Sequence, residues 1–325
     1  MNSEVTSLDE LLRTATPPGR RDTDPQRTRR AIVTGGSTGI GRYTAIALAQ
    51  DGCDVGITHA HDDSAEDAEL TARAIRHFGR KAFVEQADFK DPKTAPATVD
   101  RLVEALGGLD VYVSNAGMMV MQRFPHVELE TLEEVFRVNT FAALLGCQRA
   151  MQHLLGTAMD PEPGAGPETK LGEMAESAVE AVGQKLGATP IKDRETPGRI
   201  IVVTSVHEHV ASPVDTAYTM TKHALGGFIE CAAFETVGKN VTVNGVRPGM
   251  IATPMNNMGP EKAQDTKQPH LPTSRAGHPA EIADMVRFLA SDAASYINGQ
   301  SYDVDGGMSI GAPMAMGMYR KAVRV

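Results

Sequence analysis

The stretch Arg30-Ala31-Ile32-Val33-Thr34-Gly35-Gly36-Ser37-Thr38-Gly39-Ile40-Gly41 decides the fold of this chain. Ala31-Ile32-Val33 predicts a short buried strand, and the residues from Arg42 to Gln50 predict a helix that turns Ile46 and Leu48 inward. A Gly-rich turn between a strand and a helix lets the backbone approach a pyrophosphate, while the helix N-terminus supplies partial positive charge. Gly-rich turns are common, so it is the place between strand and helix that indicates a nucleotide cradle.

Short apolar runs alternate with longer amphipathic segments in the rest of the chain. We expect further strands at 54–58, from 82 onward, and at 109–113, 199–204 and 241–246, and helices at 65–78, 94–106 and 132–155. Strands this short, alternating with helices of ten or more residues, predict an α/β fold with a parallel sheet and right-handed crossovers.

Three segments stand apart from this alternation. Residues 1–28 are polar and Pro-containing, and we expect a disordered tail there. An insertion at about 156–198 begins with Pro and Gly and continues with an apolar stripe at helical spacing from Leu171 to Leu186. A Met-rich tail follows from about residue 308. Residues 29–325 are therefore expected to form a single domain that carries one insertion.

The overall composition excludes several classes of protein. The chain has 325 residues, a net charge of −9 and a pI near 5.6, which argue against a nucleic-acid partner. No apolar run reaches the roughly 18 residues that cross a bilayer, so we expect no membrane span. The first thirty residues lack an apolar signal core, and the three cysteines form no Cys-x-x-Cys pair. We therefore expect a cytoplasmic protein with reduced thiols.

Three side chains suggest chemistry at the ends of the strands. Tyr218 and Lys222 are four residues apart, which places them on one face of a helix. Ser205 follows the apolar run 199–204, so a strand end can deliver its hydroxyl to that helix face. Hydride transfer to or from a carbonyl needs a bound nucleotide coenzyme and groups that exchange a proton. The Gly-rich turn would bind the nucleotide, and the phenol, ammonium and hydroxyl would act on the carbonyl. This combination predicts an enzyme.

Further motifs in the same order extend the pattern to a known family. Asn115-Ala116-Gly117 closes the fourth strand, Asn139 lies in the following helix, and Pro248-Gly249 with Thr253 follows the sixth strand. Taken with the Gly-rich turn, these residues resemble the short-chain dehydrogenase/reductase superfamily from about residue 31 to 307. The resemblance implies a doubly wound, Rossmann-type parallel sheet of about seven strands with helices on both faces. It also implies an NAD(P)-dependent alcohol dehydrogenase or carbonyl reductase, which interconverts a secondary alcohol and a ketone or aldehyde.

The resemblance assigns roles to four catalytic residues. Tyr218 would be the general acid in carbonyl reduction and the base in alcohol oxidation. A free phenol has a pKa near ~10, so the ammonium of Lys222 would favour the phenolate and would also hold the nicotinamide ribose. Ser205 would bind and orient the substrate oxygen. Asn139 would hold a water that links Lys222 to solvent.

The coenzyme contacts that the resemblance implies follow several of the strands or lie on the helix of Tyr218 and Lys222. They are Gly35, Ser37, Gly39, Ile40, Gly41, His59, Asp88, Phe89, Asn115, Ala116, Gly117, Tyr218, Lys222, Pro248, Gly249, Ile251 and Thr253. An acidic residue that binds a ribose 2′-hydroxyl would stand at the end of the second strand, but His59-Ala60-His61 occupies that place. The lack of an acid removes repulsion against a 2′-phosphate, so the sequence favours NADP slightly and leaves NAD open.

The substrate class stays open between two subgroups. The stretch 204–208 is similar to bacterial glucose 1-dehydrogenases, whereas 217–227 and 251–256 are similar to bacterial relatives linked to acetoin and diacetyl. A sugar 1-dehydrogenase is therefore an alternative, and a non-catalytic dinucleotide-binding regulator is an alternative of another class. His207, Glu208 and His209 do not predict a metal site, because alternate side chains diverge along an extended chain.

Two further expectations concern the pocket wall and assembly. We expect Met118, Met119, Val120 and the stretch 256–274 to line the substrate pocket of a small molecule. Relatives commonly pair the helices that here contain 139–155 and 218–237, and we expect a homotetramer or homodimer. The apolar residues available for such a contact are Leu144, Cys147, Phe228, Cys231 and Phe234.

Overall fold

A seven-stranded parallel sheet forms the centre of the molecule. The computed structural model describes residues 7, 8, 11, 28–156, 196–265, 267–269 and 271–310. The strands run in the order β3-β2-β1-β4-β5-β6-β7, and every neighbouring pair is parallel. Their bounds are β1 Arg29–Val33, β2 Cys53–His59, β3 Ala82–Gln86, β4 Val111–Ser114, β5 Gly198–Val203, β6 Val241–Pro248 and β7 Ser301–Val304. The predicted doubly wound α/β fold is confirmed.

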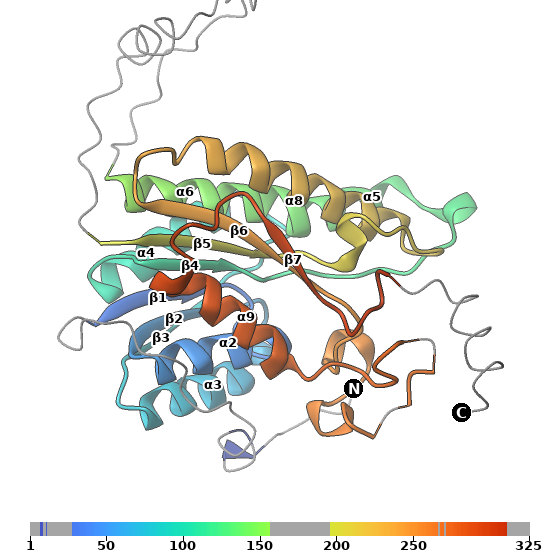
Figure 1. Ribbon diagram of the computed structural model, residues 1–325, viewed down its shortest axis with the longest axis horizontal. Helices are drawn as coiled ribbons and strands as arrows, with labels where there is room; N and C mark the ends of the chain where they lie inside the picture. The colour runs from blue at the N-terminus through green and yellow to red at the C-terminus, as the bar shows by residue number, and fades with distance from the viewer. Residues whose placement is uncertain are drawn as a thin grey trace, which may run out of the picture.

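Helices cover both faces of the sheet (Figure 1). One face carries α2 (Gly39–Gln50), α3 (Ala65–His77) and α9 (Pro279–Ala290). The other face carries α4 (Thr94–Leu106), α6 (Ala143–Leu155) and α8 (Thr216–Phe234). The short helix α5 (Leu129–Phe136) precedes α6 and contacts α8. This arrangement leaves the carboxyl ends of the strands open for a binding site.

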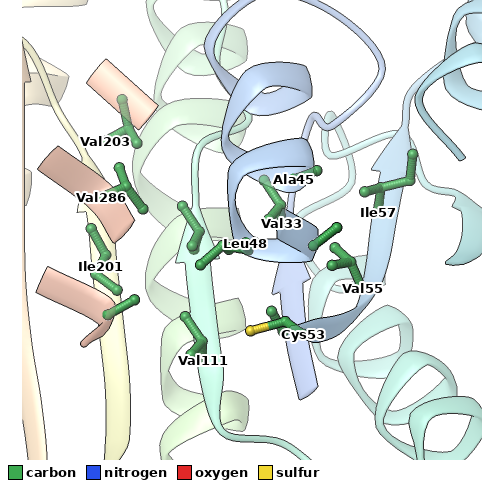
Figure 2. Close-up of a cluster of buried hydrophobic side chains, with 14 of the residues drawn as sticks. Val33, Ala45, Leu48, Cys53, Val55, Ile57, Val111, Ile201, Val203 and Val286 are labelled. Atoms are coloured by element: carbon green, nitrogen blue, oxygen red, sulfur yellow. The ribbon is translucent and has the colours of Figure 1, made fainter. Parts of the chain in front are cut away.

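Alternation along the strands fills the two cores. Val33 and Ile201 point to the face of α2 and α9, where Figure 2 shows them packed with Leu48 and Val286. Their neighbours, such as Ile200, point to the opposite face and pack with α4, α6 and α8. Because strands in the middle of a doubly wound sheet are covered on both sides, they consist of continuous apolar runs.

A helix lies where the sequence predicted one, at 132–155, but it is not a uniform α-helix. It begins earlier, as α5, then widens to a π-helical turn, η3 (Arg137–Ala142), and continues as α6. The π turn contains Asn139, whose side chain bonds to both the backbone N–H and the backbone oxygen of Met118. A π turn inserted in a helix often marks a functional position. The helical periodicity of the sequence shows the helix but not the extra residue in this turn.

One of the segments set apart by sequence, the N-terminal one, contacts the domain in the described structure. Leu11 is fully buried against Tyr43 of α2, Leu70 of α3 and Ala283 of α9. Leu8 is partly buried against the same cluster, so two leucines of the N-terminal segment pack on the domain. Disorder of residues 1–28 stays a prediction, because nearly all of them lie outside the described residues. The apolar stripe of the insertion and the tail beyond 310 lie outside them too. Among the described helices, none has the length and apolar content needed to span a membrane.

Candidate active site

A pocket of about 560 Å³ opens at the carboxyl ends of the strands. It extends from the Gly-rich turn after β1 to Tyr218 and Lys222 on α8. Except for Gly41 and Asn139, every residue predicted to bind coenzyme or to act in catalysis lines it. Residues that are far apart in the sequence therefore meet here, because parallel strands deliver their carboxyl ends to the same edge of the sheet.

The Gly-rich turn has a shape that only glycine permits. Gly35 has a φ of +65°, in the left-handed region. A methyl group on Gly41 would lie 2.1 Å from the Gly35 oxygen, so Gly41 supports the turn from inside α2 rather than lining the pocket. Helix α2 begins after Thr38 without a side-chain cap. The uncapped N-terminus and the room at the glycines fit the phosphates of a dinucleotide.

Three side chains fasten this turn to the neighbouring strands. The Thr58 hydroxyl accepts a hydrogen bond from the Gly35 N–H at 2.9 Å. The Asn115 amide donates to the Thr34 and Gly35 oxygens, and the Thr34 hydroxyl accepts from the Asn115 N–H at 2.9 Å. Sequence reasoning included Asn115 but missed Thr34 and Thr58. Their only signal was a hydroxyl at a strand end beside the turn.

The side chains predicted to act in catalysis come from the end of β5 and one face of α8. Ser205, Tyr218 and Lys222 are all nine-tenths or more buried. The Ser205 hydroxyl accepts from the His207 N–H at 3.2 Å, and its interaction with the phenol favours the ionised form of Tyr218 by lowering its pKa. Lys222 Nζ lies 5.4 Å from the centre of the Tyr218 ring and donates to the Val203 oxygen at 3.3 Å. The sequence-predicted triad is therefore assembled at one point.

Burial dominates the protonation of this pair. It raises the pKa of Tyr218 to about 12, and the hydrogen bond from Ser205 acts against this shift. It lowers the pKa of Lys222 to about 8, and the negative charge of Glu208 acts against that shift. At neutral pH the site therefore holds a phenol that can give a proton and an ammonium beside it.

Asn139 lies behind the pocket wall rather than in it. Its side chain is 1% exposed, accepts from the Met118 N–H, and donates to the Met118 oxygen and the Thr221 hydroxyl. These bonds join the loop after β4 to α8. The water that the resemblance assigns to Asn139 stays a prediction.

The far end of the pocket is formed by the ends of β2 and β3. His59 is the last residue of β2, and its Nδ1 lies 3.1 Å from the His61 oxygen and 3.2 Å from the Ser64 hydroxyl. Asp88 and Phe89, after β3, line the same end. Sequence reasoning placed these residues here but missed Ser64, which the η1 turn brings back toward His59.

Methionines form much of the remaining wall. Met118 and Met119 line the pocket as predicted, but Val120 does not. Of the described residues in 256–274, only Asn256 lines it, because the chain turns away after η5 (Pro254–Asn256). Met250, Met255 and Met308 were missed, since no local pattern shows that they face the site. In the part of the chain that the structure describes, no three His, Cys, Asp or Glu side chains are grouped to hold a metal ion.

Comparison with known proteins identifies the class of fold and site. The family model described as "short chain dehydrogenase" matches residues 29–162, and the one described as "Enoyl-(Acyl carrier protein) reductase" matches residues 177–309. The chain belongs to the short-chain dehydrogenase/reductase superfamily, and it is an oxidoreductase of that family.

Individual relatives cover nearly the whole domain. The chain is 35% identical to the uncharacterized oxidoreductase YohF of Escherichia coli K12, over 87% of this chain and 96% of that protein. It is 31% identical to L-rhamnose 1-dehydrogenase (NAD(P)(+)) of a Sphingomonas species, over 86% of this chain and 95% of that protein. The crystal structure of acetoin dehydrogenase YohF from Salmonella typhimurium superimposes with a TM-score of 0.71 at 36% identity, covering 88% of this chain and 98% of that one.

Proposed function

We propose that the protein is an NAD(P)-dependent oxidoreductase that interconverts a secondary alcohol and a ketone or aldehyde, with Tyr218 as the general acid and base. The observation that carries this proposal is the meeting of Ser205, Tyr218 and Lys222 in the wall of the pocket that begins at the Gly-rich turn. One end of the pocket fits a dinucleotide, and the other end presents a proton donor.

Three residues of the chain have separate roles in the proposed reaction. The nicotinamide coenzyme supplies the hydride in reduction and accepts it in oxidation. Ser205 binds the substrate oxygen, and Tyr218 gives that oxygen its phenolic proton in reduction or removes the proton in oxidation. The Lys222 ammonium, 5.4 Å from the phenol ring, stabilises the negative charge that develops on Tyr218.

The described residues fit an NAD(P) coenzyme. The Gly-rich turn has the open backbone that a pyrophosphate needs, and Lys222 stands where a ribose would reach the active site. The relative from Sphingomonas is named as using NAD(P)(+). At the adenosine end, His59 in place of an acid leaves room for the 2′-phosphate of NADP, which is the coenzyme we favour.

The pocket favours a small, weakly polar carbonyl compound. Met118, Met119, Met250, Met255 and Met308 present flexible apolar surface beside the catalytic residues. A ketone or hydroxyketone of the acetoin type fits such a wall, in keeping with the likeness to a structure named as an acetoin dehydrogenase.

A sugar 1-dehydrogenase is the second candidate. His207 and Asn256 add polar groups to the pocket, and one relative is named as acting on L-rhamnose. A non-catalytic dinucleotide-binding regulator gains no support from this site, because Ser205, Tyr218 and Lys222 are all present and line the same pocket.

A substrate panel tests the proposal. Acetoin, diacetyl, simple secondary alcohols and ketones, glucose and L-rhamnose should be assayed with NAD(H) and NADP(H), following the nicotinamide absorbance. We expect turnover of at least one small ketone or secondary alcohol and a higher kcat/KM than for either sugar. Preference for a sugar would favour the second candidate. Coenzyme binding without turnover of any compound in the panel would favour the regulator.

We also propose that the protein assembles as a homotetramer or homodimer. Leu144, Cys231 and Phe234 are exposed on α6 and α8, and 79% of the Phe234 surface is accessible to solvent. Cys147 and Phe228, which the sequence suggested for the same contact, instead pack in the core of the monomer. The apolar surface of α8 supports an interface there.

A further inference from the structure

Glu208 is a buried carboxylate next to the catalytic residues but outside the pocket wall. It ends the short turn η4 (Val206–Glu208), which follows Ser205 directly. Its side chain is only 10% exposed, and its Oε2 has no hydrogen-bond partner among the described residues. A buried carboxylate is unfavourable unless positive charge compensates it, so its surroundings should explain its presence.

A glycine on α8 makes room for this carboxylate. A methyl group on Gly226 would lie 2.8 Å from the Glu208 Cγ and 3.0 Å from its Cδ. Gly226 is one helical turn beyond Lys222, which is itself one turn beyond Tyr218. On the face of α8 that carries Tyr218 and Lys222, the missing side chain at Gly226 therefore leaves a gap. The side chain of Glu208 fills this gap.

On its other side, Glu208 faces a shared arginine. Arg247 of β6 places Nη1 3.6 Å from Glu208 Oε1 and Nε 3.0 Å from Asp303 Oδ1 on β7. Asp303 also lies 3.9 Å from His209 Nε2. Arg247 thus shares its positive charge between two carboxylates, so it compensates the negative charge of Glu208 only in part.

We propose that Glu208 is a positioning residue that keeps Lys222 protonated beneath Tyr218, acting through α8 rather than by contact with substrate. This inference rests on the proposed function, in which Tyr218 exchanges the proton and the Lys222 ammonium stabilises it. Without Glu208, burial would remove the proton from Lys222 at a lower pH, because the carboxylate is the charge that opposes the effect of burial on the pKa of Lys222.

Two other titratable side chains, Asp215 and His207, lie close to Tyr218. Asp215, at the start of α8, raises the pKa of Tyr218. The His207 ring lies 5.9 Å from the Tyr218 ring and meets it edge-on, with Nδ1 2.8 Å from the Val210 oxygen. Among these residues, Glu208 is the anionic side chain that acts on Lys222.

The test is the pH profile of carbonyl reduction by the Glu208→Gln variant of the full-length protein. Glutamine keeps the shape and removes the charge. With diacetyl, or the carbonyl of the panel that is reduced fastest, we expect kcat/KM within about twofold of wild type at pH 6. The alkaline limb should move to lower pH by roughly half a unit or more, a loss of about threefold on that limb. Glu230→Gln, the same change at an exposed position of α8, should leave the profile unchanged.

A second pair of variants tests the same idea without altering a charge. Gly226→Ala should move the alkaline limb in the same direction, because its methyl group displaces the carboxylate from α8. Gly227→Ala is the matched control, since nothing lies within 4 Å of a methyl group there. Alanine favours the helix over glycine by up to about 1 kcal/mol at Gly227, whereas at Gly226 the contact of the new methyl group with Glu208 opposes this gain. The readout in both variants is therefore a shift of the pH profile, which a loss of folded protein would not produce.

The outcomes separate this inference from the proposed function. A loss of activity by Glu208→Gln that is equal at every pH, or a profile identical to that of wild type, would show that Glu208 serves only its pair with Arg247 and would overturn the inference. If Tyr218→Phe, assayed in parallel, kept its activity, the proposed function itself would fail. An inactive Tyr218→Phe with an unmoved Glu208→Gln profile would reject the inference alone.

Discussion

Lys222 Nζ lies 5.4 Å from the centre of the Tyr218 ring, one helical turn along α8, and both side chains are buried at the end of β5. The two groups shift in opposite directions: burial raises the pKa of Tyr218 to about 12 and lowers the pKa of Lys222 to about 8. Between these values the phenol is still protonated while the ammonium is being lost. Below about pH 8 the pair therefore has the form that the proposed reduction requires, phenol with ammonium.

The first prediction concerns the pH dependence of carbonyl reduction. Lys222 carries its proton below its pKa of about 8 and loses it above, whereas Tyr218 stays protonated until about pH 12. We expect kcat/KM for reduction to be level near neutrality and to fall above about pH 8, as the charge that stabilises Tyr218 disappears. Initial rates in buffers of constant ionic strength measure this. A profile that stayed level to pH 10 would contradict the role of Lys222.

The second prediction concerns coenzyme choice. His59 ends β2 and lines the far end of the pocket, so His59→Asp would place a carboxylate where a ribose 2′ substituent is expected. The carboxylate would accept a hydrogen bond from the 2′-hydroxyl of NAD and repel the 2′-phosphate of NADP. We expect the ratio of kcat/KM for NAD to that for NADP to rise by about tenfold or more, about 1.4 kcal/mol.

An exposed histidine provides the control for this change. His77→Asp, at the end of α3, introduces the same charge on the surface and should leave the ratio unchanged. A ratio that moved equally in both variants, or in neither, would show that His59 does not contact the coenzyme.

The third prediction concerns the insertion at 156–198. Its ends lie at the amino edge of the sheet, where a methyl group on Gly198 would come within 3.3 Å of the Leu154 side chain. Ser205 is a full strand away, about 20 Å along β5. Deleting Met159 to Thr196 and joining the ends with a short Gly-Ser linker should therefore keep KM for small substrates within a few-fold. A large rise in KM in a folded, oligomeric deletion protein would show that the segment reaches the active site.

The fourth prediction concerns assembly. Exposed Phe234 and Leu144 on α8 and α6 supply apolar surface for an interface between subunits. Light scattering at micromolar concentration should give a dimer or tetramer, and Phe234→Glu should shift the protein toward smaller species. A wild-type monomer of 34.7 kDa would refute the proposal.

Much of the fold and of the site could be predicted because their signals are local. The strand–turn–helix from Arg30 to Gln50 shows both the start of the sheet and the coenzyme cradle. The i, i+4 spacing of Tyr218 and Lys222 places them on one helix face whatever the tertiary structure. Strand ends such as Ser205 and His59 lie at the same edge because parallel strands bring them there.

The remainder depends on contacts between distant segments, which a sequence pattern does not show. Met308 reaches the pocket from beyond β7, and Thr58 supports a turn that lies more than twenty residues before it. The π turn contains Asn139, which bonds to Met118 in the loop after β4, whereas helical periodicity alone gave a uniform helix. Glu208 was recognised only as part of a motif, because the gap at Gly226 that receives it exists only in the folded protein.

The most direct test of the account is Tyr218→Phe, measured for both turnover and coenzyme binding. Phenylalanine keeps the buried ring and removes only the hydroxyl that Ser205 contacts. We predict that kcat falls by about 10²–10⁴-fold, the usual contribution of a general acid or base, while the dissociation constant of the coenzyme changes little. If the purified variant kept more than about a tenth of the wild-type kcat, another group would be donating the proton. That result would contradict the central claim.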